Sequence, residues 1–164
     1  LVGTYPLPTP QLDRFLFKIT MSHIDREAEL QVLDSINERK RLLSKQNKVN
    51  RDDILKARKT INEQIKISRT IKTTLVDISR NLREDDRVLQ GNSTRSMVLL
   101  LPALQVHAAL RGRNYVSSED IEILIPEVLN HRIELVPGVN DFEKVLLESM
   151  ERPLEELAKS TLAK

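Results

Sequence analysis

Residues 91–112 read GNSTRSMVLLLPALQVHAALRG, and no other segment indicates as much about the fold. Gly91-Asn92-Ser93 interrupt regular structure, and a serine ahead of an apolar run is typical of a helix start. The apolar run from Met97 to Leu110 is long enough for a largely buried helix. We therefore predict a helical core, and we expect Pro102 to bend this helix and Gly112 to end it.

The composition of the whole chain agrees with a helical protein. Of its 164 residues, 40% are hydrophobic and 30% are charged, which allows a buried core and argues against disorder. Only 3% are aromatic, so the core is expected to consist of Leu, Ile, Val and Ala, which suits packed helices. There is no cysteine, so disulfides and thiolate metal sites are excluded. We find no signal peptide and no apolar run of ~20 residues, so we expect a cytoplasmic protein without a membrane partner.

Upstream of this segment, three residues that can cap a first turn each precede a predicted helix. Asp25 precedes a helix over about residues 26–40. Asn50 with Asp53 resembles a capping box at the start of the second helix. Ser68 starts the third, whose apolar residues recur at helical spacing.

Downstream, the pattern of caps and prolines predicts further helices. Ser117 and Asp120 form a capping box for a helix that Pro126 is expected to restart. Asn140 is expected to cap a helix that ends near residue 150, and Pro153 is expected to start a last one.

The first 21 residues predict a different local structure. Residues 1–10 contain three prolines and a glycine, which indicates a loop, and residues 10–13 could form one helical turn. Residues 15–21 alternate with the period of a strand that is apolar on both faces, as in a covered sheet. Since one strand cannot form a sheet, we expect its partners upstream and the chain to be a fragment of a longer protein.

The chain lacks the residues that several kinds of active site need. Its four glycines are spaced so that no GxxxxGK[ST] phosphate-binding loop can form, and no apolar run ends in the paired acids of a Walker B site. The three histidines have no ligand-like spacing, and we expect His107 to be a hydrogen-bonded core or interface residue rather than a metal ligand. We therefore expect no metal site and no catalysis by this chain alone.

The net charge of +2 hides a basic block. Residues 38–83 contain 14 Lys and Arg against 5 Asp and Glu, a net charge of +9. Such a block can bind nucleic acid or an acidic protein, and a helical binding module of this kind is one interpretation of the chain. Without aromatic residues to stack on bases, however, nucleic acid is not the expected partner.

Two arginines, Arg14 and Arg95, are candidates for phosphate binding. Arg95 is predicted in the first turn of a helix, where free amides and the helix dipole attract anions, and its guanidinium would add a forked donor. Arg14 follows Leu12-Asp13 just ahead of the predicted strand. By residue type alone, an exposed or ion-paired arginine is the better interpretation of each than a phosphate ligand, and only the position of Arg95 favours phosphate binding.

Five segments in this order resemble the MoxR family of AAA+ ATPases. Residues 3–15 (GTYPLPTPQLDRF) resemble the signature that closes the ATPase core of that family, and residues 25–29 (DREAE) fit the segment that follows. Residues 91–96 (GNSTRS) resemble its second-sensor motif, although Asn92 replaces the usual Pro or Ala. Residues 111–121 (RGRNYVSSEDI) and 128–132 (VLNHR) are similar to its GRxYVxxxDV…VLxHR stretch.

The resemblance implies a mostly α-helical fold and an ATPase function. The fold would be a helical AAA+ lid bundle, preceded by a short strand-and-helix remnant of the α/β ATPase core. The family forms rings, often hexameric, that hydrolyse ATP and act like chaperones on client proteins. Arg14 matches the arginine finger, which reaches the γ-phosphate bound by a neighbouring subunit. Arg95 matches the second sensor, and Ser93 and Thr94 beside it are further candidate ATP contacts; the upstream half would bind most of the ATP and Mg²⁺.

The same resemblance predicts three parts. Residues 1–40 would end the ATPase core, residues 41–135 would form the lid, and residues 136–164 would add C-terminal helices. A ring ATPase of the magnesium-chelatase or McrB kind is a related alternative, and the segments around Arg14 and Arg95 favour MoxR.

Overall fold

The computed structural model describes residues 7–36, 38 and 48–162, and they form two compact units. The first unit contains the described residues up to 18 and those from 60 onward; the second contains those from 19 to 59. The helices of the first unit are α1 (Thr9–Leu12), α5 (Arg69–Glu84), α6 (Thr94–Leu110), α7 (Ser118–Leu129) and α8 (Phe142–Leu162), and its strands are β1 (Val88–Gln90) and β2 (Glu134–Leu135). The second unit contains α2 (Arg26–Asp34), and α4 (Arg51–Gln64) starts there and ends in the first. The chain is mostly α-helical, as predicted.

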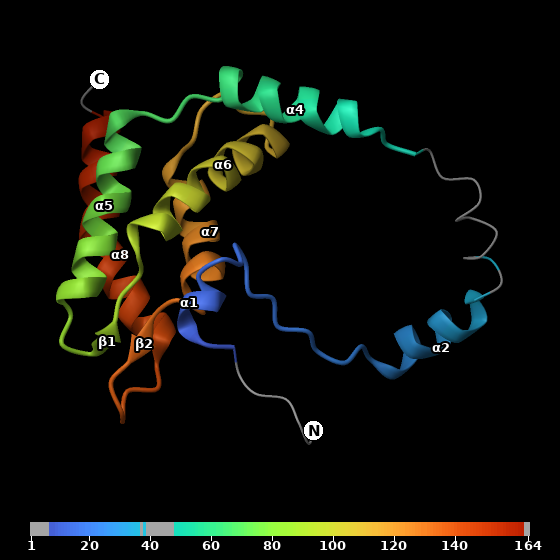
Figure 1. Ribbon diagram of the computed structural model, residues 1–164, viewed down its shortest axis with the longest axis horizontal. Coiled ribbons are helices and arrows are strands. Elements are labelled where there is room, and N and C mark those ends of the chain that lie inside the picture. Colours follow the sequence, from blue (N-terminus) through green and yellow to red (C-terminus); the bar gives the residue numbers. More distant parts are fainter. Residues whose placement is uncertain (1–6, 37, 39–47, 163–164) are drawn as a thin grey trace. The chain divides into compact units, whose positions relative to one another are not determined.

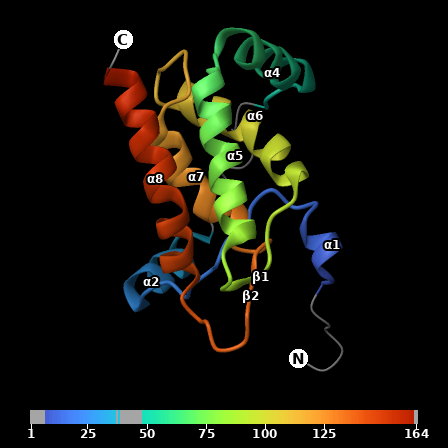
Figure 2. The ribbon, with the colours of Figure 1, turned by 90° about the vertical axis from the view of Figure 1, so that its left-hand side faces the viewer.

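The first unit is a helical bundle with one apolar core. Helices α5 and α8 lie side by side, and α6 packs on α7 (Figures 1 and 2). The largest fully buried side chains come from all four helices and are aliphatic: Ile78, Leu82, Leu100, Leu104, Ile121, Ile125, Leu129 and Leu146. Burying side chains of this size stabilises a fold by about 1.5–3 kcal/mol each. The prediction of an aliphatic helical core is thereby confirmed.

The only sheet in the described part of the chain is a short antiparallel pair. β1 pairs with β2, with Val88 opposite Leu135 and Gln90 opposite Glu134. It lies at the end of the bundle where α5 finishes and α8 begins (Figure 2). The sequence did not indicate this pair, because strands of two and three residues are too short to show a period. The strand expected over residues 15–21 does not form, since the described residues offer it no neighbouring strand.

Three predicted helix starts are confirmed. The Asp25 carboxylate accepts from the Ala28 amide at 2.8 Å, and the Ser68 hydroxyl accepts from the Ile71 amide at 3.1 Å. The amide of Ser117 donates to the Asp120 carboxylate at 2.8 Å, as in a capping box. At the start of α8 the capping carboxylate belongs to Asp141 and not to the predicted Asn140.

Two predicted helix breaks are wrong, because α7 continues through Pro126 and α8 continues through Pro153. A proline inside a helix leaves the carbonyl four residues earlier without its amide donor. For Pro153 that carbonyl belongs to Ser149, and the Asn81 side-chain amide from α5 donates to it at 2.9 Å. A tertiary hydrogen bond therefore replaces the missing helical one, and α8 remains a single helix of 21 residues.

Helix α6 is also continuous, and it contains Pro102 in its middle. It ends at Leu110, and Gly112 follows with a φ of 72°, a left-handed conformation that favours glycine at a helix end. The predicted stop at Gly112 is thus confirmed.

The compact units do not follow the predicted boundaries at residues 40 and 135. Helix α8 packs on α5 and α7 within one unit, and the residues around α1 belong to that same unit. The division by function into core end, lid and C-terminal helices stays a prediction. Residues 39–47, which contain part of the basic block and the end of the first predicted helix, lie outside the described residues.

Candidate functional site

The two arginines singled out in the sequence are both exposed. Arg14 lies in the turn after α1, where its amide donates to the Gln11 carbonyl at 3.2 Å. Arg95 is the second residue of α6, and Thr94 and the N-cap Ser93 beside it are exposed as well. Each guanidinium is therefore open to a ligand or a neighbouring molecule.

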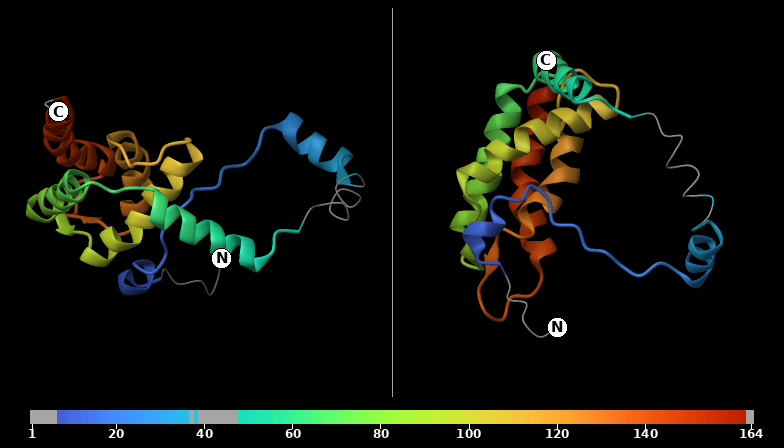
Figure 3. Two further views of the ribbon diagram at one scale, coloured as in Figure 1. Left: turned by 90° about the horizontal axis from the view of Figure 1, so that it is seen from above. Right: turned by 45° about the vertical axis from the view of Figure 1, so that its right-hand side comes forward.

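Asp13 joins the two segments that carry these arginines. Its carboxylate accepts from the hydroxyl of Ser93, the N-cap of α6, at 3.1 Å and from the hydroxyl of Ser96 in the first turn at 3.0 Å. It also accepts from Nε of Arg132 at 3.0 Å. Asp13 immediately precedes Arg14, so the turn that carries Arg14 is fastened to the helix start that carries Arg95. In the ribbon, the short helix α1 lies beside the start of α6 (Figure 3, right).

Arg132 anchors this turn from inside the bundle. Its side chain is 1% exposed and forms an ion pair with the Asp13 carboxylate. Its guanidinium also donates to the carbonyls of Phe15, Leu16 and Val128, the bond to Leu16 being 3.0 Å long. A buried guanidinium is tolerated only when its donors find acceptors, and these four residues supply them.

His131 adds a second contact to the same turn. Its Nε2 lies 2.8 Å from the Phe15 carbonyl, which fits a neutral ring that donates through Nε2. Nδ1 is buried with no hydrogen-bond partner. Burial lowers the pKa of His131, and the positive charges of Arg132 and Lys18 lower it further against the opposing effects of the Phe15 carbonyl and Asp13.

The electrostatics of Asp13 favour its charged form. Burial by itself would raise the pKa of Asp13, but hydrogen bonds from Ser96, Ser93 and Arg132 outweigh it and hold the pKa below its usual value. The carboxylate therefore stays charged at neutral pH, and it lies near the positive end of the α6 dipole.

The segment that precedes α6, Gly91 and Asn92, packs closely against α5. A Cβ atom at Gly91 would lie 2.5 Å from Cγ of Arg83, so any other residue would require Arg83 to shift. Asn92 is buried, and its amide donates to the Ser79 hydroxyl at 2.8 Å. Arg83 donates to the same hydroxyl at 2.7 Å. Asn92 thus fastens the segment that leads to Arg95 to α5.

A second polar network lies apart from the arginines and organises the start of α7. The carboxylate of Asp120 is fully buried and accepts two hydrogen bonds from Arg113, at 2.7 and 2.8 Å. Its Oδ1 lies 2.5 Å from Nδ1 of His107. His107, expected to be a hydrogen-bonded core or interface residue, is hydrogen-bonded and partly buried. Burial would raise the pKa of Asp120, but Arg113, the Ser117 amide and His107 together lower it to about 2.

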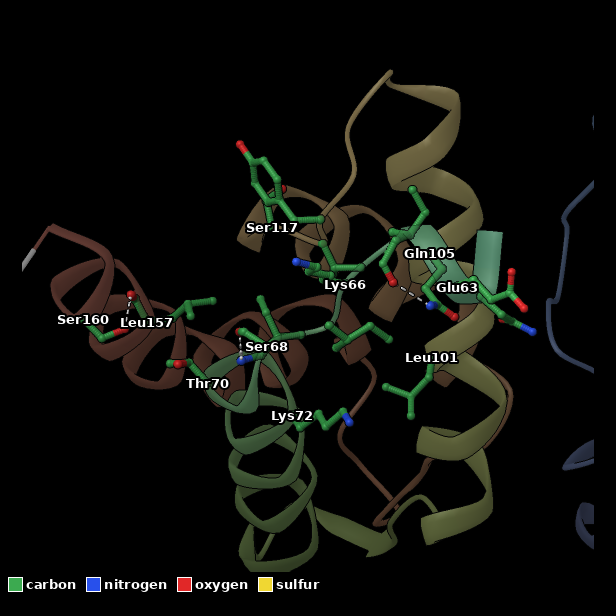
Figure 4. Close-up of a pocket in the computed structure, with 16 residues that line it drawn as sticks. Glu63, Lys66, Ser68, Thr70, Lys72, Leu101, Gln105, Ser117, Leu157 and Ser160 are labelled. Carbon is green, nitrogen blue, oxygen red and sulfur yellow. Dashed lines mark hydrogen bonds between the residues drawn. The ribbon is translucent and has the colours of Figure 1, made fainter. Parts of the chain in front are cut away.

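The described residues of the first unit line at least four hollows, one of which, of about 600 Å³, lies beside the end of α7 and the start of α8. The largest, about 920 Å³, is a groove formed by the end of α4, the start of α5, α6 and the end of α8; Lys66, Ser68, Gln105 and Ser117 are among the residues that line it (Figure 4). A second, of about 540 Å³, lies where Phe15 and Phe17 face His131 and Ile133. A third, of about 350 Å³, is beside the start of α6, lined by Thr94 and Met97 together with Arg80 and Arg83 of α5. Thr94 alone of the predicted site residues lines any of them.

Two features are absent from the described residues. No group of three or more His, Cys, Asp or Glu residues is arranged to hold a metal ion. None of the helices in that part of the chain is long and apolar enough to cross a membrane.

The chain is similar to known proteins in both sequence and fold. The AAA lid domain family matches residues 80–155, which run from the end of α5 into α8. The protein YeaC of Bacillus subtilis is 33% identical over 152 residues, covering 93% of this chain and 47% of its own length. Chaperone MoxR1 of Mycobacterium tuberculosis is 29% identical over 150 residues, or 81% of this chain and 37% of its own length.

A solved structure has the same fold. It is the crystal structure of a protein from Cytophaga hutchinsonii that is proposed to be an ATPase. The two superpose with a TM-score of 0.73 at 29% identity, covering 92% of this chain and 49% of that one. The chain belongs to the MoxR family of AAA+ ATPases. It spans about half the length of YeaC and of the Cytophaga protein, and a smaller share of MoxR1.

Within this MoxR-family chain, the residues that hold the site together were not predicted from the sequence. The segment of residues 128–132 was noted only for its resemblance to the family, and nothing indicated that Arg132 and His131 contact Asp13 and Phe15. These pairs are separated by about 120 positions, so no periodicity or spacing relates them. The available signal was an arginine three positions after the apolar end of α7, which needs an acidic partner when it is buried.

Proposed function

We propose that this chain is the C-terminal part of a longer ATP-hydrolysing AAA+ protein, and that it supplies two arginines to the ATP sites of a ring. Arg14 acts as the arginine finger for the ATP of the neighbouring subunit. Arg95 acts as the second sensor for the ATP of its own subunit, with Ser93 and Thr94 beside it at the start of α6. ATP and Mg²⁺ are bound mainly by the upstream half, which carries the phosphate-binding loop.

One observation carries this proposal. Two exposed arginines, more than 80 positions apart in sequence, lie in segments that a single carboxylate holds together. An arginine without a function at the surface does not need to be held in a fixed position. An arginine that stabilises charge on a transferring phosphoryl group does, because its effect depends on its position.

The start of α6 fits a phosphate group. It is the first turn of a helix of 17 residues, so its dipole favours an anion. Arg95 and Thr94 are exposed there, and the hollow beside Thr94 is also lined by Arg80 and Arg83. The Ser93 hydroxyl donates to Asp13, so Ser93 contributes by shaping the helix start.

The chemistry that follows is charge stabilisation. Bound ATP with Mg²⁺ provides the phosphoryl group that is transferred to water. Arg14 of the neighbouring subunit places positive charge where negative charge grows on that group, and Arg95 does the same from the lid. Because Arg95 lies on the lid, lid position depends on which nucleotide is bound, which couples hydrolysis to movement of the protein.

The assembly and its targets are part of the proposal. A finger that acts on a neighbour requires a ring of identical subunits, for which six is the number expected of this family. MoxR1 is named a chaperone. We propose a chaperone-like action on client proteins in the cytoplasm.

ATP turnover separates this proposal from a binding module. The chain alone is expected to release no phosphate above buffer, whereas the longer protein hydrolyses ATP. In the longer protein, Arg95→Ala is expected to weaken nucleotide binding or turnover about tenfold or more with an unchanged melting temperature. Arg152→Ala, an exposed arginine paired with Glu156 on α8, is the control and keeps full activity. If Arg95→Ala matches this control, Arg95 is not a second sensor.

A further inference from the structure

Asp13 and Arg132 are not assigned a role by the proposed function, yet they connect both of its arginines. Asp13 contacts the first turn of α6 through Ser93 and Ser96, and it is covalently next to Arg14. Arg132 fixes Asp13 from the buried side and donates to the main chain on the far side of Arg14, at Phe15 and Leu16. The turn around Arg14 is therefore held at both ends.

We propose that Asp13 and Arg132 are positioning residues that link the two nucleotide sites served by one subunit. The inference rests on the proposed function, in which Arg95 responds to the subunit's own ATP and Arg14 acts on the neighbour's ATP. A displacement of the α6 start moves Ser93 and Ser96, and with them Asp13. Arg14 moves with Asp13, so its position at the neighbour's ATP depends on the nucleotide bound by its own subunit.

The strength of the link follows from its chemistry. An ionised carboxylate that accepts three hydrogen bonds, one from a guanidinium, is held more tightly than a neutral acceptor would be. The pKa of Asp13 is lowered, so the link is fully charged at neutral pH. The ring of His131 supports the same turn through the Phe15 carbonyl. By contrast, the Arg14 side chain is exposed and free to reach outward.

Asp13→Asn is the variant that tests the link. It keeps the size of the side chain and removes its charge, and Asp13 is 25% exposed, so the core is disturbed little. Replacing Arg132, which is 1% exposed, would risk the fold itself. Asp141→Asn is the matched control, because asparagine caps a helix as well as aspartate does.

The first measurement is hydrogen exchange on the 164-residue chain. Asp13→Asn is expected to speed exchange of the amides of Arg14 and Phe15, which bond to the carbonyls of Gln11 and Leu12, and to leave the α5 and α8 amides unchanged. Asp141→Asn leaves the Arg14 and Phe15 amides unchanged. If these amides already exchange in the wild type at the rate of an unfolded peptide, or if Asp13→Asn leaves them slow, the link does not exist. Both outcomes are independent of any ATPase role.

The second measurement mixes subunits of the longer protein. Asp13→Asn is expected to lower turnover about 10- to 100-fold, the size of effect that a misplaced catalytic group has. Mixing it with a subunit whose phosphate-binding loop is disabled restores activity, because some Asp13→Asn subunits then receive an intact Arg14 from the neighbour. A defect that only weakened the fold would not be repaired by mixing.

Three results would overturn the inference. Full activity of Asp13→Asn shows that Arg14 needs no positioning. No recovery on mixing, under conditions where Arg14→Ala does recover, shows that Asp13 acts on its own subunit's site. If Arg14→Ala does not recover either, the trans role in the proposed function fails and the inference fails with it, while the exchange result still tells whether the link exists.

Discussion

Asp120 connects α6, the following loop and α7 through one carboxylate. It is fully buried, and its partners are His107, Arg113 and the Ser117 amide. Asp120→Asn removes the negative charge that pairs with Arg113. It also replaces a carboxylate oxygen that accepts hydrogen bonds with an amide NH₂ group that cannot accept them. Losing one partner of a buried pair costs about 3 kcal/mol, or about 6–12 °C in melting temperature for a domain of this size. Thermal unfolding followed by circular dichroism measures the change in melting temperature. Asp141→Asn is the control and is expected to melt like the wild type. Equal melting temperatures of the two variants would show that the Asp120 network does not stabilise the fold.

His131 gives the site a dependence on pH. Its pKa is lowered in the folded chain by burial and by the charges of Arg132 and Lys18, with Asp13 opposing them. The unfolded chain therefore binds a proton more readily, and the contribution of neutral His131 to stability is complete above pH 6.5 and is lost as the pH falls below it. Hydrogen exchange of the Phe15 amide, corrected for the intrinsic effect of pH, is expected to accelerate between pH 7.5 and 5.5. His131→Gln keeps a donor but cannot titrate, so it abolishes the dependence; a dependence that persists would place it on another group.

For single residues, the sequence predicted the exposed candidates Arg14 and Arg95 better than it predicted Asp13 and Arg132, which hold their segments in place. Arg95 could be placed in a first helical turn because Ser93 and an apolar run mark that start. The contact of Asp13 with Arg132 spans 119 positions and depends on the packed bundle, so no local pattern contains it.

At the scale of elements, α8 shows how a tertiary contact overrides a local signal. Pro153 was expected to begin a new helix, but the Asn81 amide supplies the donor that Ser149 lacks. Asn81→Ala is expected to cost about 1 kcal/mol in the free energy of unfolding. In a Pro153→Ala background the helix can form its own bond to Ser149, so the same change at Asn81 costs less. Urea unfolding of the four variants measures this coupling, and equal costs in both backgrounds would contradict it.

Most helix starts were predictable, and the short strands were not. A helix cap is a hydrogen bond between residues only two or three positions apart, so a local pattern contains it. The sequence therefore shows the caps at Asp25, Ser68 and Ser117. The pairing of β1 with β2 joins residues nearly 50 positions apart and comprises too few residues to show alternation. The apolar segment after Arg14 alternates like a strand, but alternation predicts a strand only where a partner is present.

At the scale of the whole molecule, the first unit is expected to fold without the N-terminal segment. A shortened chain that begins at Val49 keeps all of α4 to α8 and the shared core. It should show helical circular dichroism and one cooperative melt. It should be about 2–4 kcal/mol less stable than the full chain, since Arg132 is left buried without Asp13 and the carbonyls of Phe15 and Leu16.

Arg132→Met tests whether the shortened chain is less stable because Arg132 has lost its partners or because packing is lost in general. In the shortened chain it removes the unpaired buried charge and is expected to restore stability. In the full chain the same change breaks the ion pair with Asp13 and is expected to destabilise. The same sign in both chains would show that Arg132 does not depend on the N-terminal turn.

Arg14 is proposed to act on the ATP of the neighbouring subunit. The direct measurement is ATP turnover in mixtures of two inactive forms of the longer protein, one with Arg14→Ala and one with a disabled phosphate-binding loop. Arginine fingers are worth on the order of 10³-fold or more in rate, far above the ~1 kcal/mol of a surface ion pair, so each form alone is expected to be nearly inactive. On mixing, some neighbours combine an intact Arg14 with an intact loop, and turnover returns. If Arg14→Ala alone keeps its activity, or if mixing with demonstrated subunit exchange restores nothing, Arg14 is not a finger that acts in trans.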